Sequence, residues 1–127
     1  MKDKPLVTRV TLRALEKLLT GWVEEDNDCV IKFYSPRCHY CKLLAPPYHA
    51  IAEKYDKVSF MAFNVFDVPE EFEIGELVEL NGVPTIIKFK TGPFGKPSIH
   101  TLQEPAEPNE YTWYWPEDIE TFINEEF

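Results

Sequence analysis

Two cysteines, Cys38 and Cys41, are separated by two residues in a stretch that carries only positive charge, since no acid occurs at residues 29–52. The neighbouring positions supply the cations: Arg37, His39 and Lys42. If the pair opens a helix, the unpaired N–H groups of that helix end stabilise a thiolate and lower its pKa, as do the cations. The spacing then predicts Cys38 as an exposed nucleophile and Cys41 as the resolving thiol in disulfide exchange.

Two other interpretations of the pair remain open. Zinc sites use the same spacing, but a structural zinc needs two more ligands. The sequence has no second Cys-x-x-Cys pair, and the candidates are Cys29, His39, His49 and His100. The third interpretation is a pair of ordinary buried cysteines. A strand-to-helix junction at the pair favours the redox interpretation over both. Cys29 itself, at the start of an apolar run, is expected to be a core residue.

Composition excludes several classes of protein. The chain has 127 residues, 44% hydrophobic, and a net charge of −9, so we expect one domain over residues 1–127. Net negative charge argues against a nucleic-acid binder and against adsorption to an anionic membrane. No apolar signal region follows Lys2 and Lys4, which predicts a cytoplasmic protein. A signal removed beforehand would instead place it in a secretory compartment.

Hydrophobic periodicity predicts alternating strands and helices that would position the cysteines. Strands are expected at residues 7–10, 29–34, 58–65, 85–90 and 97–102. Helices are expected at residues 12–22, 38–55 and 70–80 and from Pro116 onward. Pro46 and Pro47 should kink the second helix. Early alternation gives parallel pairing and a turn at 91–95 gives an antiparallel hairpin, so we expect a mixed sheet with helices on both faces.

The segment around the cysteines resembles the active site of the thioredoxin superfamily, and most of all the catalytic domains of protein disulfide isomerases. Residues 32–42 read KFYSPRCHYCK, and LAPP follows at 44–47. A second match is residues 82–85 (GVPT), where the superfamily has a cis-proline against the disulfide. The resemblance covers residues 7–102 and the last helix. It implies a thioredoxin fold, an α/β fold with a central mixed sheet, and a cis bond at Val83–Pro84.

The resemblance also implies a function. The chain would be a protein disulfide oxidoreductase that acts on protein disulfides or thiols without an organic cofactor, because the cysteine pair carries the two electrons. Its electron donor would be a reductase or glutathione, and it would be a monomer. Tyr40, Val83 and Pro84 would line the substrate groove. Two alternatives remain: a binding or chaperone module with weak redox activity, and a metal or iron–sulfur protein.

Three residues near the cysteines depart from the family pattern. Lys32 stands where the family has a buried acid, so it could stabilise a thiolate, titrate downward, or reach solvent along the sheet edge. Arg37 replaces a tryptophan and suits an acidic or less apolar substrate. His39, with Tyr40 between the cysteines, would stabilise the thiolate when protonated and make the pair more oxidising; otherwise it is a solvated side chain.

Residues 103–115 (QEPAEPNEYTWYW) are longer, more acidic and more aromatic than the matching loop of the family. One interpretation is a wall beside the active site, from which aromatic side chains touch substrate. Its candidates are Tyr111, Trp113, Tyr114 and Trp115. The other interpretation is that Trp113 and Trp115 pack on the last helix and close the core.

Overall fold

The central strand β2 (Asp28–Tyr34) is buried along residues 29–33 and organises the fold. In the computed structural model, which describes residues 6–21, 23–69, 72–93 and 95–127, five strands form one sheet in the order β1-β3-β2-β4-β5. β1 (Val7–Arg9) and β3 (Val58–Asn64) run parallel, as do β3 and β2. β4 (Thr85–Lys90) pairs antiparallel with β2, and β5 (His100–Thr101) with β4. The predicted mixed sheet is confirmed.

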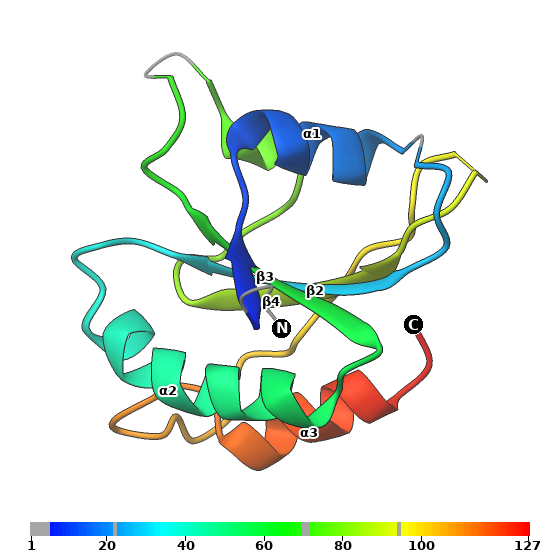
Figure 1. Ribbon diagram of the computed structural model, residues 1–127. Helices are drawn as coiled ribbons and strands as arrows, with labels where there is room; N and C mark the ends of the chain where they lie inside the picture. The colour runs from blue at the N-terminus through cyan, green and yellow to red at the C-terminus, as the bar shows by residue number, and fades with distance from the viewer. Residues whose placement is uncertain (1–5, 22, 70–71, 94) are drawn as a thin grey trace.

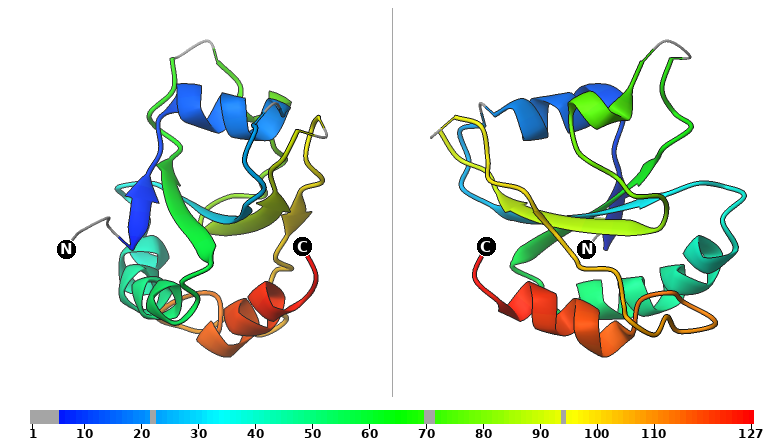
Figure 2. Two further views of the ribbon diagram at one scale, coloured as in Figure 1. Left: turned by 45° about the vertical axis from the view of Figure 1, so that its right-hand side comes forward. Right: turned by 180° about the vertical axis from the view of Figure 1, so that it is seen from behind.

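Helices cover both faces of this sheet (Figures 1 and 2). Helix α1 (Leu12–Thr20) covers one face, where Leu15 and Leu19 pack with the alternate β2 residues Ile31 and Phe33. Helices α2 (His39–Lys54) and α3 (Pro116–Asn124) lie side by side on the other face, around Val30. Because a strand points successive side chains to opposite faces, β2 contributes to both apolar clusters.

The helix boundaries follow local chemistry. Thr11 caps α1 by accepting the N–H of Ala14 at 3.1 Å, and Pro116 opens α3 at a position where its missing N–H costs nothing. Helix α2 continues through Pro46 and Pro47, so neither proline ends it. Gly21 ends α1 with a left-handed φ of 92°.

One predicted element is wrong, and another is shorter than expected. Residues 72–80 form only one turn of 3-10 helix, η1 (Ile74–Glu76), instead of an α-helix. Gly75 disfavours a longer helix, and the turn already packs Ile74 and Leu77 onto the α1 face of the sheet. Of residues 97–102, only His100 and Thr101 pair with β4. Parts of three predicted elements lie outside the described residues: Trp22, Glu70, Glu71 and Phe94. In the part that is described, no helix is long and apolar enough to cross a membrane.

The end of α1 provides a test of packing. A Cβ added at Gly21 would overlap the backbone N and Cα of Lys96. Gly95 also has a positive φ, 99°, but open space around it. We expect Gly95→Ala to lower the free energy of unfolding by about 1–2 kcal/mol, through backbone strain alone. Gly21→Ala should lower it further, because the clash adds to the strain. Urea unfolding measures both, and equal losses would contradict the contact.

Candidate active site

The two cysteines form a disulfide at the junction between β2 and α2. Cys38 is the N-cap of α2: its Sγ accepts the N–H of Cys41 at 3.1 Å, and the Cα atoms lie 5.2 Å apart. The N–H of Cys38 donates to the carbonyl of Ser35 at 3.2 Å, which closes a turn over Pro36 and Arg37. Cys38 is half-buried, whereas Cys41 is only 3% exposed. The predicted helix-end position is therefore confirmed, and only Cys38 offers its sulfur to a large partner.

Basic side chains flank the two cysteines along the chain. Arg37, His39 and Lys42 are all exposed, and neither Arg37 nor Lys42 pairs with a carboxylate of any described residue. The ring of His39 lies against that of Tyr40, with centroids 5.9 Å apart. Because these charges are not neutralised by acids, they favour a thiolate over a thiol at Cys38 when the pair is reduced. Their effect on reactivity stays a prediction.

The second motif supplies a turn at the same edge of the sheet. The peptide bond between Val83 and Pro84 is cis, as the resemblance implied. Phe33 pairs with Thr85, so Pro84 lies at the edge where β2 ends and leads to the disulfide. Pro84 is buried and Val83 is half-buried, which leaves Val83 able to contribute surface beside the pair.

The loop at residues 103–115 reaches the active site through Trp113. Its ring packs on that of Tyr40, which lies between the two cysteines in the sequence, and the ring centroids are 5.3 Å apart. Its indole N–H donates to Glu104 Oε2 at 2.6 Å. Trp113 has a φ of 67°, which is strained for a side chain of this size. The loop therefore holds this ring against the redox motif at some cost in backbone energy.

A tight turn keeps Trp113 in place. The N–H and carbonyl groups of Asn109 and Trp113 bond each other, both at 3.0 Å. The side-chain oxygen of Asn109 accepts the N–H of Tyr111 at 2.8 Å and that of Thr112 at 3.2 Å. An asparagine that bonds the backbone ahead of it is a common way to fix a turn. The bonds of four residues thus determine the turn together.

Tyr114 anchors the loop to the cis-proline turn. Its side chain is only 1% exposed, and its hydroxyl donates to the carbonyl of Pro84 at 3.2 Å. Burial raises the pKa of Tyr114, so the hydroxyl keeps the proton that makes this bond. The sequence contained no signal for this link, since its partners lie far apart in the chain.

The structure contradicts the core interpretation for Trp115, agrees with it in part for Trp113, and leaves the wall interpretation a prediction. Trp115 is 39% exposed and donates its indole N–H to the carbonyl of Glu107 at 2.7 Å, so it does not close the core. Tyr114 does so instead, beside α3 residues such as Ile119. Trp113 is half-buried, with contacts to the core as well as to Tyr40. Tyr111 is 62% exposed. Contact of these side chains with substrate stays a prediction.

Lys32 is buried, so it does not extend along the sheet edge to solvent. It is 5% exposed, and its ammonium lies 4.9 Å from the ring centroid of Tyr48 and 5.8 Å from that of Tyr34. Burial lowers the pKa of Lys32 to about 8, the direction that one of the interpretations expected. Lys32 and Cys41 line the same cavity on the inner side of the disulfide.

The third cysteine is a core residue, as predicted. Cys29 is 3% exposed, and burial, with a smaller contribution from Asp28, raises the pKa of its thiol to about 12. Such a thiol is inert near neutral pH. Across the described ranges, no three residues among His, Cys, Asp and Glu are grouped to hold a metal ion.

Comparisons with known proteins agree with this geometry. The family model described as Thioredoxin matches residues 10–109. A thioredoxin of Echinococcus granulosus is 34% identical over 92 residues, which are 72% of this chain and 79% of that protein. A protein disulfide-isomerase of Oryctolagus cuniculus is 29% identical over 124 residues, covering 80% of this chain and 24% of that protein.

A solved structure shares the fold. Mitochondrial thioredoxin 3 of Saccharomyces cerevisiae, in its oxidised form, superposes with a TM-score of 0.60 and covers 92% of each chain at 22% identity. The chain spans a quarter or less of the length of the protein disulfide-isomerases that it matches.

The buried ammonium predicts a pH-dependent stability. Near pH 7, Lys32 is charged in the folded and unfolded chains, and its burial costs free energy. Lys32→Met should raise the free energy of unfolding by up to about 3 kcal/mol, because the pKa falls from 10.5 to about 8 and each pKa step of one is about 1.36 kcal/mol. Between about pH 8 and 10.5, Lys32 is largely neutral in the folded chain but still protonated in the unfolded chain, so the wild type gains stability as the pH rises. The difference in free energy of unfolding between Lys32→Met and the wild type therefore shrinks.

Urea unfolding near pH 7 and near pH 10 measures this difference. Lys88→Met is the matched control, because the Lys88 ammonium is buried but donates to the carbonyl of Phe122 at 2.6 Å. That variant should lose stability. A gain for Lys32→Met that is the same at both pH values would contradict the assignment.

Proposed function

The chain belongs to the thioredoxin family, and from that premise we propose that it catalyses thiol–disulfide exchange on protein substrates. The observation that carries the proposal is the Cys38–Cys41 disulfide at the N-terminus of α2, with Cys38 accessible and Cys41 buried. An accessible nucleophile beside a sheltered second thiol is what two-step exchange requires.

In the reductive direction, the thiolate of Cys38 attacks one sulfur of a substrate disulfide. A bond forms between Cys38 Sγ and that sulfur, and the other substrate sulfur leaves as a thiolate. Cys41, as thiolate, then attacks Cys38 Sγ, which releases the second substrate thiolate and forms the Cys38–Cys41 disulfide. Two electrons pass to the substrate, and both released thiolates take protons from solvent. Oxidation of a substrate dithiol is the same sequence in reverse.

Three features support these roles for the surrounding residues. The N–H of Cys41 already points at Cys38 Sγ, so the helix end stabilises negative charge on that sulfur. The half-buried rings of Tyr40 and Trp113 form an aromatic surface beside it. Arg37 and Lys42 add positive charge, which favours substrate segments that carry acids.

The electron partner follows from the same chemistry. The Cys38–Cys41 disulfide must be reduced after each turnover, and we propose a reductase or glutathione as the donor. No organic cofactor is required. A monomeric state and a cytoplasmic location stay predictions from the sequence.

Substitution of each cysteine tests the exchange reaction. Cys38→Ser should abolish the acceleration of insulin reduction by dithiothreitol and leave the rate of dithiothreitol alone, because the attacking sulfur is gone. Cys41→Ser should stop at the first step and accumulate a mixed disulfide with the substrate, visible by mass spectrometry. Cys29→Ala is the matched control and should keep its activity. Full turnover by Cys38→Ser would overturn the proposal, and a chain that only binds unfolded protein would show no difference among the three variants.

The aromatic surface predicts a substrate-selective loss. Trp113→Ala should lower kcat/KM for insulin by up to roughly tenfold, since an aromatic contact contributes about 0.5–1.5 kcal/mol. Its reaction with dithiothreitol, which is too small to span the surface, should not change. Trp115→Ala is the comparison variant, because the ring packed on Tyr40 is that of Trp113, whereas the Trp115 indole N–H donates to the carbonyl of Glu107. Equal losses with both substrates would indicate a structural role for Trp113 instead.

A further inference from the structure

A cavity of about 360 Å³ lies behind the disulfide, between the sheet and the first half of α2. Cys41 forms part of its wall, but the cavity does not reach Cys38, Tyr40, Pro84 or Trp113. It is therefore separate from the surface proposed to bind protein substrates.

Positive charge lines this cavity. Four of its lining residues carry basic side chains, and none of the described residues that line it is acidic: Arg9, Lys32, Lys42 and His49 are the basic ones. Three of the four are exposed, whereas Lys32 is only 5% exposed. The cations come from β1, β2 and α2, so the fold gathers them from three separate segments. This concentration contrasts with the net charge of −9 on the whole chain.

The ammonium of Lys32 has no hydrogen-bond or ion-pair partner among the residues that the structure describes. Its neighbours are the rings of Tyr48 and Tyr34, which attract a cation but accept no hydrogen bond in place of water. A buried ammonium without a partner costs free energy. Its three donors are thus available to whatever enters the cavity.

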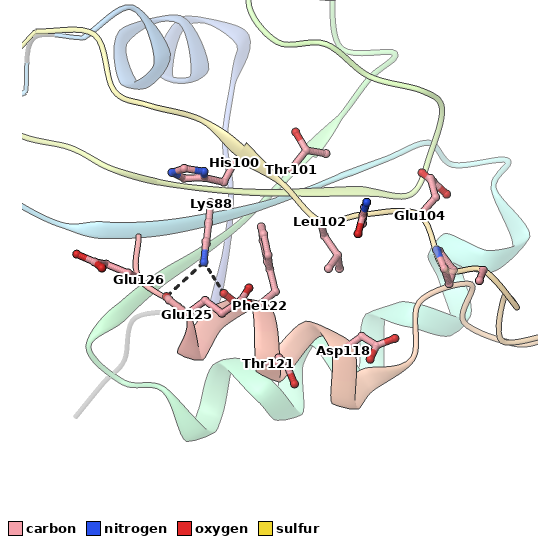
Figure 3. Close-up of a pocket in the computed structure, with 13 residues that line it drawn as sticks. Lys88, His100, Thr101, Leu102, Glu104, Asp118, Thr121, Phe122, Glu125 and Glu126 are labelled. Carbon is pink, nitrogen blue, oxygen red and sulfur yellow. Dashed lines mark hydrogen bonds between the residues drawn. The ribbon is translucent and has the colours of Figure 1, made fainter.

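Lys88, a second buried lysine of the sheet, has the hydrogen-bond acceptors that Lys32 lacks among the described residues. Lys88, on β4, is 3% exposed, and its Nζ donates to the carbonyls of Phe122 and Glu125 at 2.6 and 3.3 Å. Figure 3 shows the Lys88 side chain reaching the C-terminal end of α3, with both bonds drawn. Carbonyls at a helix C-terminus are a favourable site for a cation. Lys88 needs no ligand, and Lys32 lacks an equivalent partner.

We propose that the cavity behind the disulfide binds a small molecule that carries a carboxylate or phosphate group. The anionic group pairs with the Lys32 ammonium inside the cavity, Arg9 and Lys42 attract it from the exposed sides, and His49 can donate a ring N–H to it. An ion pair made where water is partly excluded, with hydrogen bonds from the ammonium, replaces the lost hydration of Lys32. The proposal does not depend on the exchange activity, because the cavity is present in the oxidised protein, whose cysteines are held in the disulfide.

Calorimetry on the oxidised full chain tests this proposal with two probes, inorganic phosphate and succinate, at constant ionic strength. We expect saturable one-to-one binding of at least one probe, and the two arms distinguish phosphate from carboxylate recognition. Lys32→Met should weaken that binding at least tenfold, and Lys88→Met should leave it unchanged. No saturable binding to the wild type at millimolar concentrations, or equal binding by Lys32→Met, would overturn the proposal.

A second measurement on the wild type keeps the test valid if a variant does not fold. The Cε resonance of Lys32 reports its own protonation in ¹³C-labelled oxidised protein, where Cys41 is held in the disulfide and does not titrate. A bound anion favours the charged ammonium, so the pKa of Lys32 should rise when the probe is added. An unchanged pKa at saturating probe would overturn the proposal. The other titratable groups that face Lys32 have separate resonances: Arg9, Tyr34, Lys42, Tyr48 and His49.

Discussion

The hydrogen bond from the N–H of Cys41 to Cys38 Sγ is the interaction on which the site depends. It makes a sulfur the N-cap of α2, in the place where serine or aspartate is usual. The helix can begin there only because β2 is fixed by strands on both sides and by helices on both faces, so its end has one position. The sheet pairing fixes where α2 begins, and the start of α2 fixes the position and exposure of Cys38 Sγ. A change in the sheet or in the helix cap therefore moves the reactive sulfur.

Local patterns predicted the parts of the structure that local chemistry decides. The β2 strand, the Thr11 cap, Pro116 at the start of α3 and the burial of Cys29 all follow from side-chain type and spacing. Contacts between distant segments contribute to each failure. A helix was expected at residues 70–80 from apolar spacing, yet Gly75 and packing on the sheet allow a single turn. Likewise, no spacing indicated which aromatic side chain of 103–115 would be buried, since Pro84 decides that through Tyr114.

The two buried lysines show most directly what local sequence cannot predict. Lys32 stands in the sequence VIKF and Lys88 in IIKF, each inside a strand, on the same face of one sheet. Their local sequences are nearly the same, but one ammonium reaches the carbonyl end of α3 and the other faces aromatic rings and a cavity. The two ammonium groups differ because the carbonyl end of α3 lies against Lys88 and not against Lys32. A buried charge in a sequence therefore identifies a position to examine, and only the fold shows whether it is satisfied.

The sheet ends on both sides in very short strands, three residues in β1 and two in β5. An exposed edge strand offers unpaired backbone groups to any extended polypeptide, and its length sets how firmly such a segment can attach. Edges this short give an incoming chain few backbone bonds. The thiol–disulfide exchange proposed at Cys38 can then proceed without an extended substrate segment being drawn into a shared β-sheet.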